Sequence, residues 1–156
     1  MNKISFTDLT HTGQSISANT IPLGIGMVAS NAKKHLKNKI NLDVFRYPED
    51  FSKYLENNKP NIAAFSVFSW NLSLSHTFAE MIKNKNKNVI TIFGGPNFPI
   101  GNDEQADFLR KYNFIDFYVE GEGEKAFVSL YSELEKIDFN INKFKENNTI
   151  VPNVRY

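Results

Sequence analysis

The chain has 156 residues, which is enough for one domain, and its 41% hydrophobic content is sufficient for a buried core. It carries 18 basic and 17 acidic residues, a balance that argues against a nucleic-acid partner because such proteins usually show a basic excess. It has no cysteine, which excludes disulfides, thiolate metal sites and an iron–sulfur cluster held by its own side chains, and it has no apolar run of the roughly 18 residues that a membrane span requires.

Strand-like and helix-like segments alternate from the start of the chain. Residues 4–9 are predicted to form a first strand, which begins so early that no signal peptide is expected, and we expect a cytoplasmic protein. Residues 10–20 are polar and form an unusually long connection, which in a compact domain is often functional. A helix is predicted from Pro22, with apolar residues at helical spacing. These residues are Leu23, Met27, Val28, Ala32 and Leu36.

The middle of the chain predicts the most deeply buried strands. Residues 40–45 alternate apolar and polar side chains, as a half-buried strand does, and Pro48 opens a second helix. Residues 61–68 and 89–93 are almost continuously apolar, which is typical of central parallel strands covered on both faces. The remaining expected elements are helices over residues 73–83, 103–111 and 125–136 and a strand over residues 115–119.

This alternation predicts an α/β fold in which right-handed crossovers join parallel strands. We expect a Rossmann-like, flavodoxin-like, doubly wound five-stranded parallel sheet with helices on both faces, formed by residues 1–136. The Asn-rich residues 137–156 are expected to add a short strand near Ile150 and Val151, or to form a linker. In such sheets ligands bind beyond the carboxyl ends of the strands, where the strand order reverses.

The first two loops after the strands carry polar and aromatic candidates for ligand binding. The long loop offers Thr10, His11 and Gly13, although a single loop histidine is more often simply exposed to solvent. The loop after the central strand carries Ser66, Phe68, Ser69 and Trp70. Trp70 is the only tryptophan, and at this position it either stacks on a ligand or caps the core.

The last two loops are rich in glycine. Gly94, Gly95 and Pro96 follow the fourth strand, where missing Cβ atoms let backbone approach a ligand or simply form a turn. The fifth strand ends in Glu120, Gly121 and Glu122, then a second Gly-Glu pair. These carboxylates could bind a cation, act as acid and base, or cap the next helix.

Taken in order, these segments resemble the cobalamin-binding domain at the N-terminus of cobalamin-dependent radical SAM enzymes. The matching segments are residues 22–27, 65–71, 94–96 and 115–124, and the resemblance extends over about residues 3–134. It implies a Rossmann-like domain that holds cobalamin at the carboxyl edge of its sheet. It implies no catalytic residue and no metal-ligating side chain in this chain.

The resemblance also implies roles for individual residues. Ser66 would lie near the nucleotide tail, as does the serine of the Ser-x-Leu element, and Phe68 stands where that element has leucine. The paired Gly94 and Gly95 would let the tail pass close to the backbone. The walls of the site would come from Thr10, His11, Gly13, Ser69, Trp70, Pro96, Glu120, Gly121 and Glu122.

Two departures from known patterns limit what the resemblance implies. The mutase type of cobalamin domain uses Asp-x-His-x-x-Gly, whose histidine binds cobalt, whereas Asp8, His11 and Gly13 have the wrong spacing, as is usual in the radical SAM relatives. The lower face of cobalt would therefore be bound by water, by a residue of the long loop, or by no ligand. The cysteine motif of a radical SAM domain is also absent, so an iron–sulfur cluster and S-adenosylmethionine would belong to a covalently attached domain in a longer, methyltransferase-like enzyme.

On this basis the chain is expected to be an excised or free-standing cobalamin module that does not catalyse alone and binds neither nucleic acid nor a membrane. The alternative is a flavodoxin-like domain that binds another small molecule, or an acid–base enzyme that uses Glu120 and Glu122.

Overall fold

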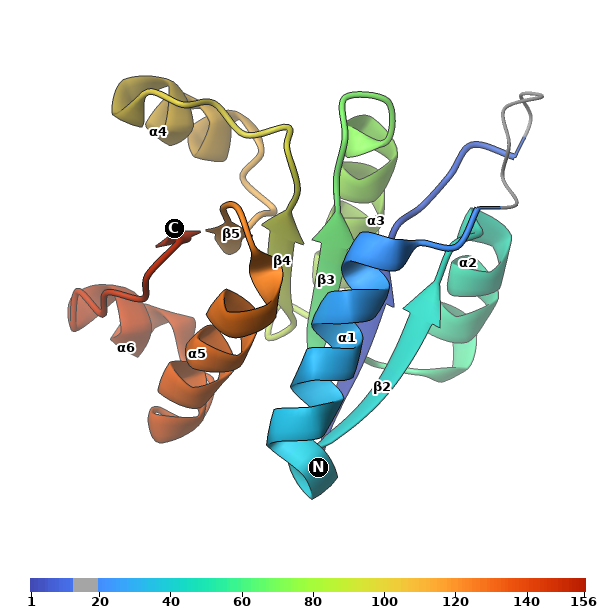
Figure 1. Cartoon of the computed structure of the whole chain (residues 1–156), viewed down its shortest axis with the longest axis horizontal. Helices are drawn as coiled ribbons and strands as arrows, with labels where there is room; N and C mark the ends of the chain where they lie inside the picture. The colour runs from blue at the N-terminus through green and yellow to red at the C-terminus, as the bar shows by residue number, and fades with distance from the viewer. Residues whose placement is uncertain (13–19) are drawn as a thin grey trace.

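A computed structural model describes residues 1–12 and 20–156, and in this part of the chain the strands form one sheet between two helical layers (Figure 1). The strands are β1 (Asn2–Thr7), β2 (Ile40–Phe45), β3 (Ile62–Ser66), β4 (Ile90–Gly94), β5 (Phe117–Val119) and β6 (Val154–Arg155). The helices are α1 (Leu23–Leu36), α2 (Pro48–Asn57), α3 (Leu72–Lys85), α4 (Asn102–Lys111), α5 (Gly123–Lys136) and α6 (Ile141–Glu146), with a short 3-10 turn η1 (Lys37–Lys39).

The strand order is β2-β1-β3-β4-β5-β6, and the first five strands are parallel. The doubly wound arrangement is therefore confirmed, with the reversal of strand order beside β1. The expected number of strands was wrong, because the sheet has six. The extra strand, β6, pairs antiparallel with β5. Two residues are too few to show an alternating pattern in the sequence.

The last strand also lies later in the chain than expected. Asn153 adopts a positive φ of 62°, and its carbonyl oxygen accepts a hydrogen bond from the Glu120 backbone at 2.8 Å. Val154 then pairs with Val119 in the sheet, whereas Ile150 is 90% exposed. The tail thus turns back at Asn153 and completes the edge of the sheet.

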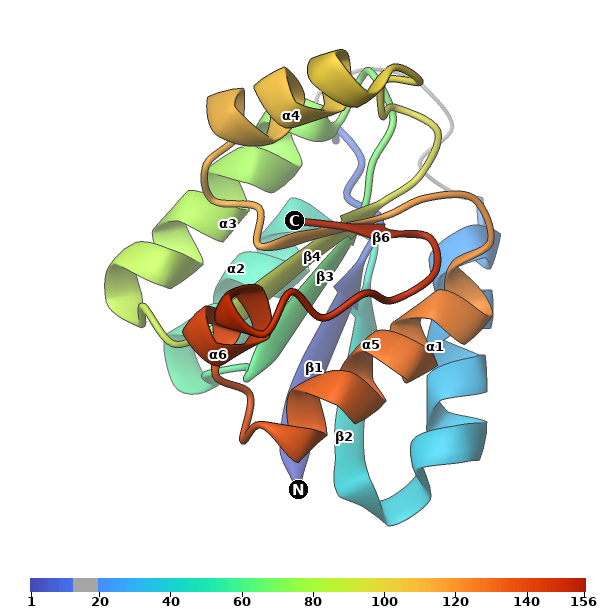
Figure 2. The same cartoon turned by 90° about the vertical axis from the view of Figure 1, so that its left-hand side faces the viewer.

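Helices cover both faces of the sheet (Figure 2), and a hydrophobic core lies on each face. Helices α1, α5 and α6 cover one face, where alternate residues such as Phe6, Ile92 and Phe117 point. Helices α2, α3 and α4 cover the other, which receives Phe65 and Phe93. The continuous burial of β3 and β4 confirms that these are the central strands.

The buried side of α1 differs from the expected one. Leu23 and Met27 are 67% and 50% exposed, whereas the helix buries Ala32 and Leu36, as expected, together with Ile25 and Ala29. The two sets both recur at helical spacing, so periodicity alone does not choose between them. The difference matters because Ile25 faces the site described below. Among the described residues, no helix is both long and apolar enough to cross a membrane.

Candidate functional site

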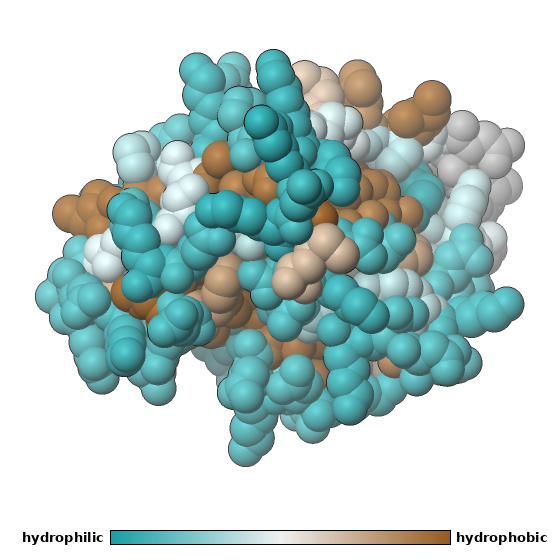
Figure 3. Space-filling view, turned by 90° about the horizontal axis from the view of Figure 1, so that it is seen from below, coloured by the Kyte–Doolittle hydropathy of each residue, from teal (hydrophilic) through white to brown (hydrophobic). Residues whose placement is uncertain are grey.

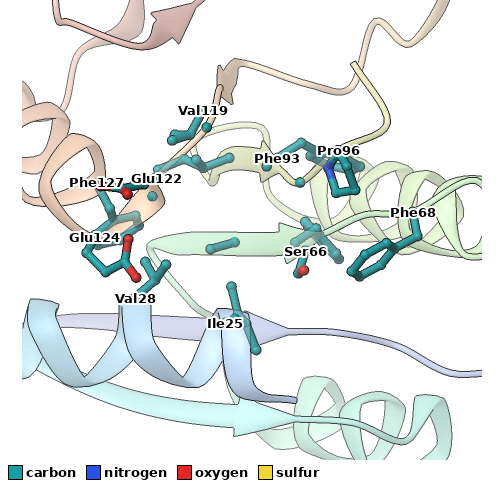
Figure 4. Close-up of a pocket in the computed structure, with 18 residues that line it drawn as sticks. Ile25, Val28, Ser66, Phe68, Phe93, Pro96, Val119, Glu122, Glu124 and Phe127 are labelled. Atoms are coloured by element: carbon teal, nitrogen blue, oxygen red, sulfur yellow. The ribbon is translucent and has the colours of Figure 1, made fainter.

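Three parallel strands end at the same level and form the floor of a crevice. Ser66 pairs with Gly94, and Gly94 pairs with Val119, so these residues form a row across the sheet. All three point to the face covered by α1 and α5, since they alternate with residues of the opposite core. The crevice above them has a volume of about 350 Å³ (Figure 4), within the range of about 300–1,000 Å³ typical of ligand sites.

Two glycines at the end of β4 let backbone segments approach closely at the edge of the crevice. Gly95 has a φ of 120°, and a Cβ atom there would lie 2.3 Å from the Val67 carbonyl oxygen. At Gly94 a Cβ would lie 3.3 Å from the Val119 carbonyl oxygen. The buried hydroxyl of Tyr118 donates a hydrogen bond to the Gly95 carbonyl at 3.0 Å, which fixes the turn. This turn therefore depends on glycine for steric reasons.

The opposite wall comes from the first turns of α1 and α5. The apolar side chains of Ile25, Val28 and Phe127 line it, together with Gly24 (Figure 4). The helices pack so closely that a Cβ on Gly123 would lie 2.9 Å from a methyl carbon of Val28. Both helices begin at the crevice, where their free N–H groups favour polar or anionic parts of a ligand.

The structure brings seven of the predicted site residues to the crevice and leaves the others outside it. The seven that line it are Ser66, Phe68, Gly94, Gly95, Pro96, Gly121 and Glu122. Thr10, His11, Ser69, Trp70 and Glu120 lie outside its lining, and Gly13 falls outside the described residues. The sequence interpretation missed the helical wall, for which the small residues early in α1 were the available signal.

His11 contacts the loop after β3. Its Nε2 atom lies 2.9 Å from the Trp70 carbonyl oxygen. A carbonyl oxygen only accepts hydrogen bonds, so Nε2 carries the proton and donates it.

Asp8, in the same segment as His11, forms an ion pair with Arg46 at 2.8 Å. Burial nevertheless raises the pKa of Asp8, because desolvation outweighs the attraction of Arg46.

Trp70 stacks on Phe68 and does not cap the core. The ring centroids are 4.5 Å apart and the planes differ by 6°, and Trp70 is 63% exposed. Phe68 lines the crevice and lies beyond Ser66, past the end of β3, in Figure 4. The aromatic pair therefore extends the apolar surface of the crevice outward.

The acidic residues do not converge on one point. Glu120 forms an ion pair with Arg155 of β6 at 3.0 Å, whereas Glu122 and Glu124 line the crevice. Within residues 1–12 and 20–156 no group of three or more His, Asp or Glu side chains is arranged to hold a metal ion. The site is thus mainly apolar with backbone groups at its edges.

A second cavity of about 580 Å³ lies at the amino ends of the strands, between the last turns of α2 and α3. Figure 3 views the molecule from this side, where patches of hydrophobic residues lie among hydrophilic ones. Helix carboxyl ends present carbonyl oxygens and no free N–H groups. The crevice at the carboxyl edge is therefore the better candidate for a ligand site.

Comparison with known proteins identifies the class to which this fold and crevice belong. The model of the B12 binding domain family matches residues 11–131, which is most of the chain. The chain therefore belongs to the B12-binding domain family, and cobalamin is the cofactor that this membership implies. The resemblance predicted from the loops and the Rossmann-like fold are confirmed.

Three relatives that the chain resembles are much longer methyltransferases. The chain is 33% identical over 72 residues to the "Cobalamin-dependent radical SAM methyltransferase TokK" of Streptomyces tokunonensis, a match covering 46% of this chain and 10% of the relative. It is 32% identical over 74 residues to the "2-(S-pantetheinyl)-carbapenam-3-carboxylate methyltransferase" of Streptantibioticus cattleyicolor, covering 47% and 10%. It is 29% identical over 118 residues to the "Uncharacterized methyltransferase PH0819" of Pyrococcus horikoshii, covering 74% and 25%.

The crevice has room for part of a large cofactor that combines apolar and polar groups. Its floor is apolar at Ala64 and Ile92, while the Ser66 hydroxyl offers one polar group at the edge. The missing Cβ atoms of Gly94 and Gly95 expose backbone to a ligand. These features agree with cobalamin as the occupant.

Proposed function

We propose that this domain is the cobalamin-binding module of a larger cobalamin-dependent radical SAM enzyme, and that it holds the corrinoid at the carboxyl edge of its sheet without a histidine ligand to cobalt. The observation that carries the proposal is the apolar crevice along the row Ser66, Gly94 and Val119 in a chain of the B12-binding family. Cobalamin, when bound, would supply the cobalt chemistry of the whole enzyme.

The protein side chains have separate roles in this proposal. Ser66 hydrogen-bonds the nucleotide tail, and Gly94 and Gly95 leave room for the tail beside the backbone. The stacked Phe68 and Trp70 present an apolar face to the corrinoid at the open side of the crevice. Pro96, Gly121 and Glu122 supply further walls of the crevice. Thr10, His11, Ser69 and Glu120 lie outside its lining and are proposed, with Gly13 of the same long loop, to contact the part of the corrinoid that extends beyond it.

The state of His11 argues against a cobalt bond through its Nε2 atom. Its Nε2 atom donates to the Trp70 carbonyl oxygen, and a nitrogen that carries a proton has no lone pair for a metal. The spacing of Asp8, His11 and Gly13 also differs from Asp-x-His-x-x-Gly. Nε2 of His11 would have to lose its partner before it could bind cobalt.

A covalently attached radical SAM domain is proposed from the chemistry that this chain lacks. Without cysteine it has no thiolate for an iron–sulfur cluster, so that cluster and S-adenosylmethionine are assigned to another domain. The matched region is only 10% of the length of TokK, which is named a radical SAM methyltransferase. We place the cobalamin module in residues 1–136 and the connection to the other domain through residues 137–156, whose α6 and β6 pack on the sheet.

The acid–base alternative has less support. Glu120 pairs with Arg155 at 3.0 Å, and no histidine or lysine is among the residues that line the crevice in the described part of the chain. Glu122 therefore has no second titratable group of a different type beside it in the crevice lining.

The proposal is tested by mixing the purified chain with hydroxocobalamin, removing free corrinoid on a desalting column, and recording the visible spectrum. We expect retained corrinoid in an equimolar amount. After reduction to the cobalt(II) form, the EPR spectrum should show no splitting from an axial histidine nitrogen, and His11→Ala should leave it unchanged. Absence of retained corrinoid would contradict the binding role, and a nitrogen splitting that His11→Ala abolishes would contradict the unligated state.

A further inference from the structure

Asn71 is a buried residue that connects the loops after β1 and β3. Its side chain is fully buried, and its amide nitrogen donates to the carbonyl oxygens of Leu9 at 3.0 Å and Ser66 at 3.1 Å. The same nitrogen lies 3.4 Å from a carboxylate oxygen of Asp8. Its oxygen accepts a hydrogen bond from the Phe68 backbone at 2.7 Å. One amide group therefore joins two neighbouring strand exits.

The side chain of Asn71 does not cap α3, the helix that follows it. Asn71 occupies the N-cap position of α3, where asparagine normally accepts a hydrogen bond from a backbone N–H of the first turn. No such bond is present in α3. By contrast, Asn140 at the N-cap of α6 accepts one from the Lys143 backbone at 3.1 Å. The side chain of Asn71 therefore forms its hydrogen bonds with the two loops and not with the first turn of α3.

The segment that Asn71 holds contains the aromatic pair. Phe68, whose backbone N–H it binds, lines the crevice and stacks on Trp70. The Trp70 carbonyl oxygen in turn accepts the hydrogen bond from His11. A shift of Asn71 would therefore move the aromatic pair relative to the row that begins at Ser66.

We propose that Asn71 is a positioning residue for cobalamin, which fixes Phe68 and Trp70 at the open side of the crevice and ties them to the exit of β1. The proposal rests on the proposed function, because it takes cobalamin as the ligand of the crevice. It requires asparagine specifically. Aspartate would keep the oxygen that accepts from Phe68 but would set a second oxygen against the carbonyl oxygens of Leu9 and Ser66.

The test uses the 156-residue chain with Asn71→Asp, which has almost the same shape as the native residue. Because Trp70 is the only tryptophan, acrylamide quenching of its fluorescence reports on the aromatic pair alone. We expect altered quenching without ligand, and a Kd for hydroxocobalamin that is weaker by about tenfold or more, as unpaired buried groups require. Asn140→Asp is the matched control and should change neither measurement.

A second control separates positioning from general stability. Ile82→Val removes one methyl group from the far end of α3, where Ile82 is 4% exposed, and lowers stability without touching either loop. The proposal is overturned if Asn71→Asp retains the wild-type Kd and quenching, or if its Kd weakens no more than that of Ile82→Val when both are compared at the same fraction folded.

Two further outcomes are also decisive. If Asn71→Asp does not fold, Asn71→Ser replaces it under the same criteria, since serine keeps a small hydrogen-bonding group. If the wild-type chain retains no hydroxocobalamin, the proposed function fails and the cobalamin role of Asn71 fails with it. The quenching comparison without ligand still decides whether Asn71 positions Trp70, so the two failures are distinguishable.

Discussion

Gly24 provides a direct test of the crevice, because a side chain can be added there without disturbing the fold. A Cβ atom on Gly24 meets nothing within 4 Å, yet the residue lines the crevice. Gly24→Leu should therefore preserve the folded state and raise helix propensity by up to about 0.8 kcal/mol. The added side chain would project where the cofactor binds. Overpacking of a filled site typically costs about 1–3 kcal/mol, which corresponds to a loss of affinity of about 5- to 150-fold.

Gly26 is the matched control for this experiment. It lies on the same helix, a Cβ there also meets nothing within 4 Å, and it is not part of the crevice lining. Titration of each variant with hydroxocobalamin, followed by visible absorbance, gives the Kd values, and thermal unfolding without ligand gives the stabilities. We expect weakened binding only in Gly24→Leu. Equal Kd values for Gly24→Leu and Gly26→Leu would refute the placement of cobalamin in this crevice.

Three other predictions concern the surroundings of the site. Tyr118→Phe removes the hydrogen bond to the Gly95 carbonyl at 3.0 Å and should lower the free energy of unfolding by about 1 kcal/mol, measured by urea denaturation; an unchanged midpoint would show that the bond contributes nothing. Gly95→Ala should cost more than Tyr118→Phe in the same assay, because its Cβ would lie 2.3 Å from the Val67 carbonyl oxygen; a smaller loss would mean that the turn relaxes freely. Burial lowers the pKa of His76 in the folded chain, so as the pH falls the unfolded chain binds a proton at this histidine first. The free energy of unfolding should therefore be highest above the ordinary histidine pKa of about 6.5 and should decrease as the pH falls below it. His76→Phe should flatten this part of the stability–pH curve, and an identical curve would assign the effect to other groups.

The parts of the fold that depend on local pattern were predictable from the sequence. The unbroken apolar runs of β3 and β4 identified the central strands, and the glycines at Gly94 and Gly95 identified a strand exit where backbone approaches closely. A short strand in the tail was one of two expectations, but the position and pairing of β6 were not predictable, because they depend on a turn at Asn153 and on only two residues.

The helical wall of the crevice could be predicted only in part, through the small residues early in α1. Ile25 and Phe127 lie about a hundred residues apart in the chain and meet at the crevice only because α1 and α5 cover the same face. Periodicity indicates that a helix has an apolar side but not which segments that side will contact. The exposure of Trp70 was likewise undecided, since either a core position or a stacked surface position fits an aromatic residue at a strand exit.

The row formed by Ser66, Gly94 and Val119 makes the site sensitive to the length of the strands as well as to residue identity. In a parallel sheet a shift by one residue turns every side chain to the opposite face. Deletion of Thr91 with the pairing of Ile90 preserved would put Gly95 in place of Gly94 in the row and turn the Phe93 side chain away from its own core. Such a deletion would alter the binding site while leaving every lining residue in the sequence, so comparisons between homologues should weigh insertions and deletions in β3 to β5 as heavily as substitutions.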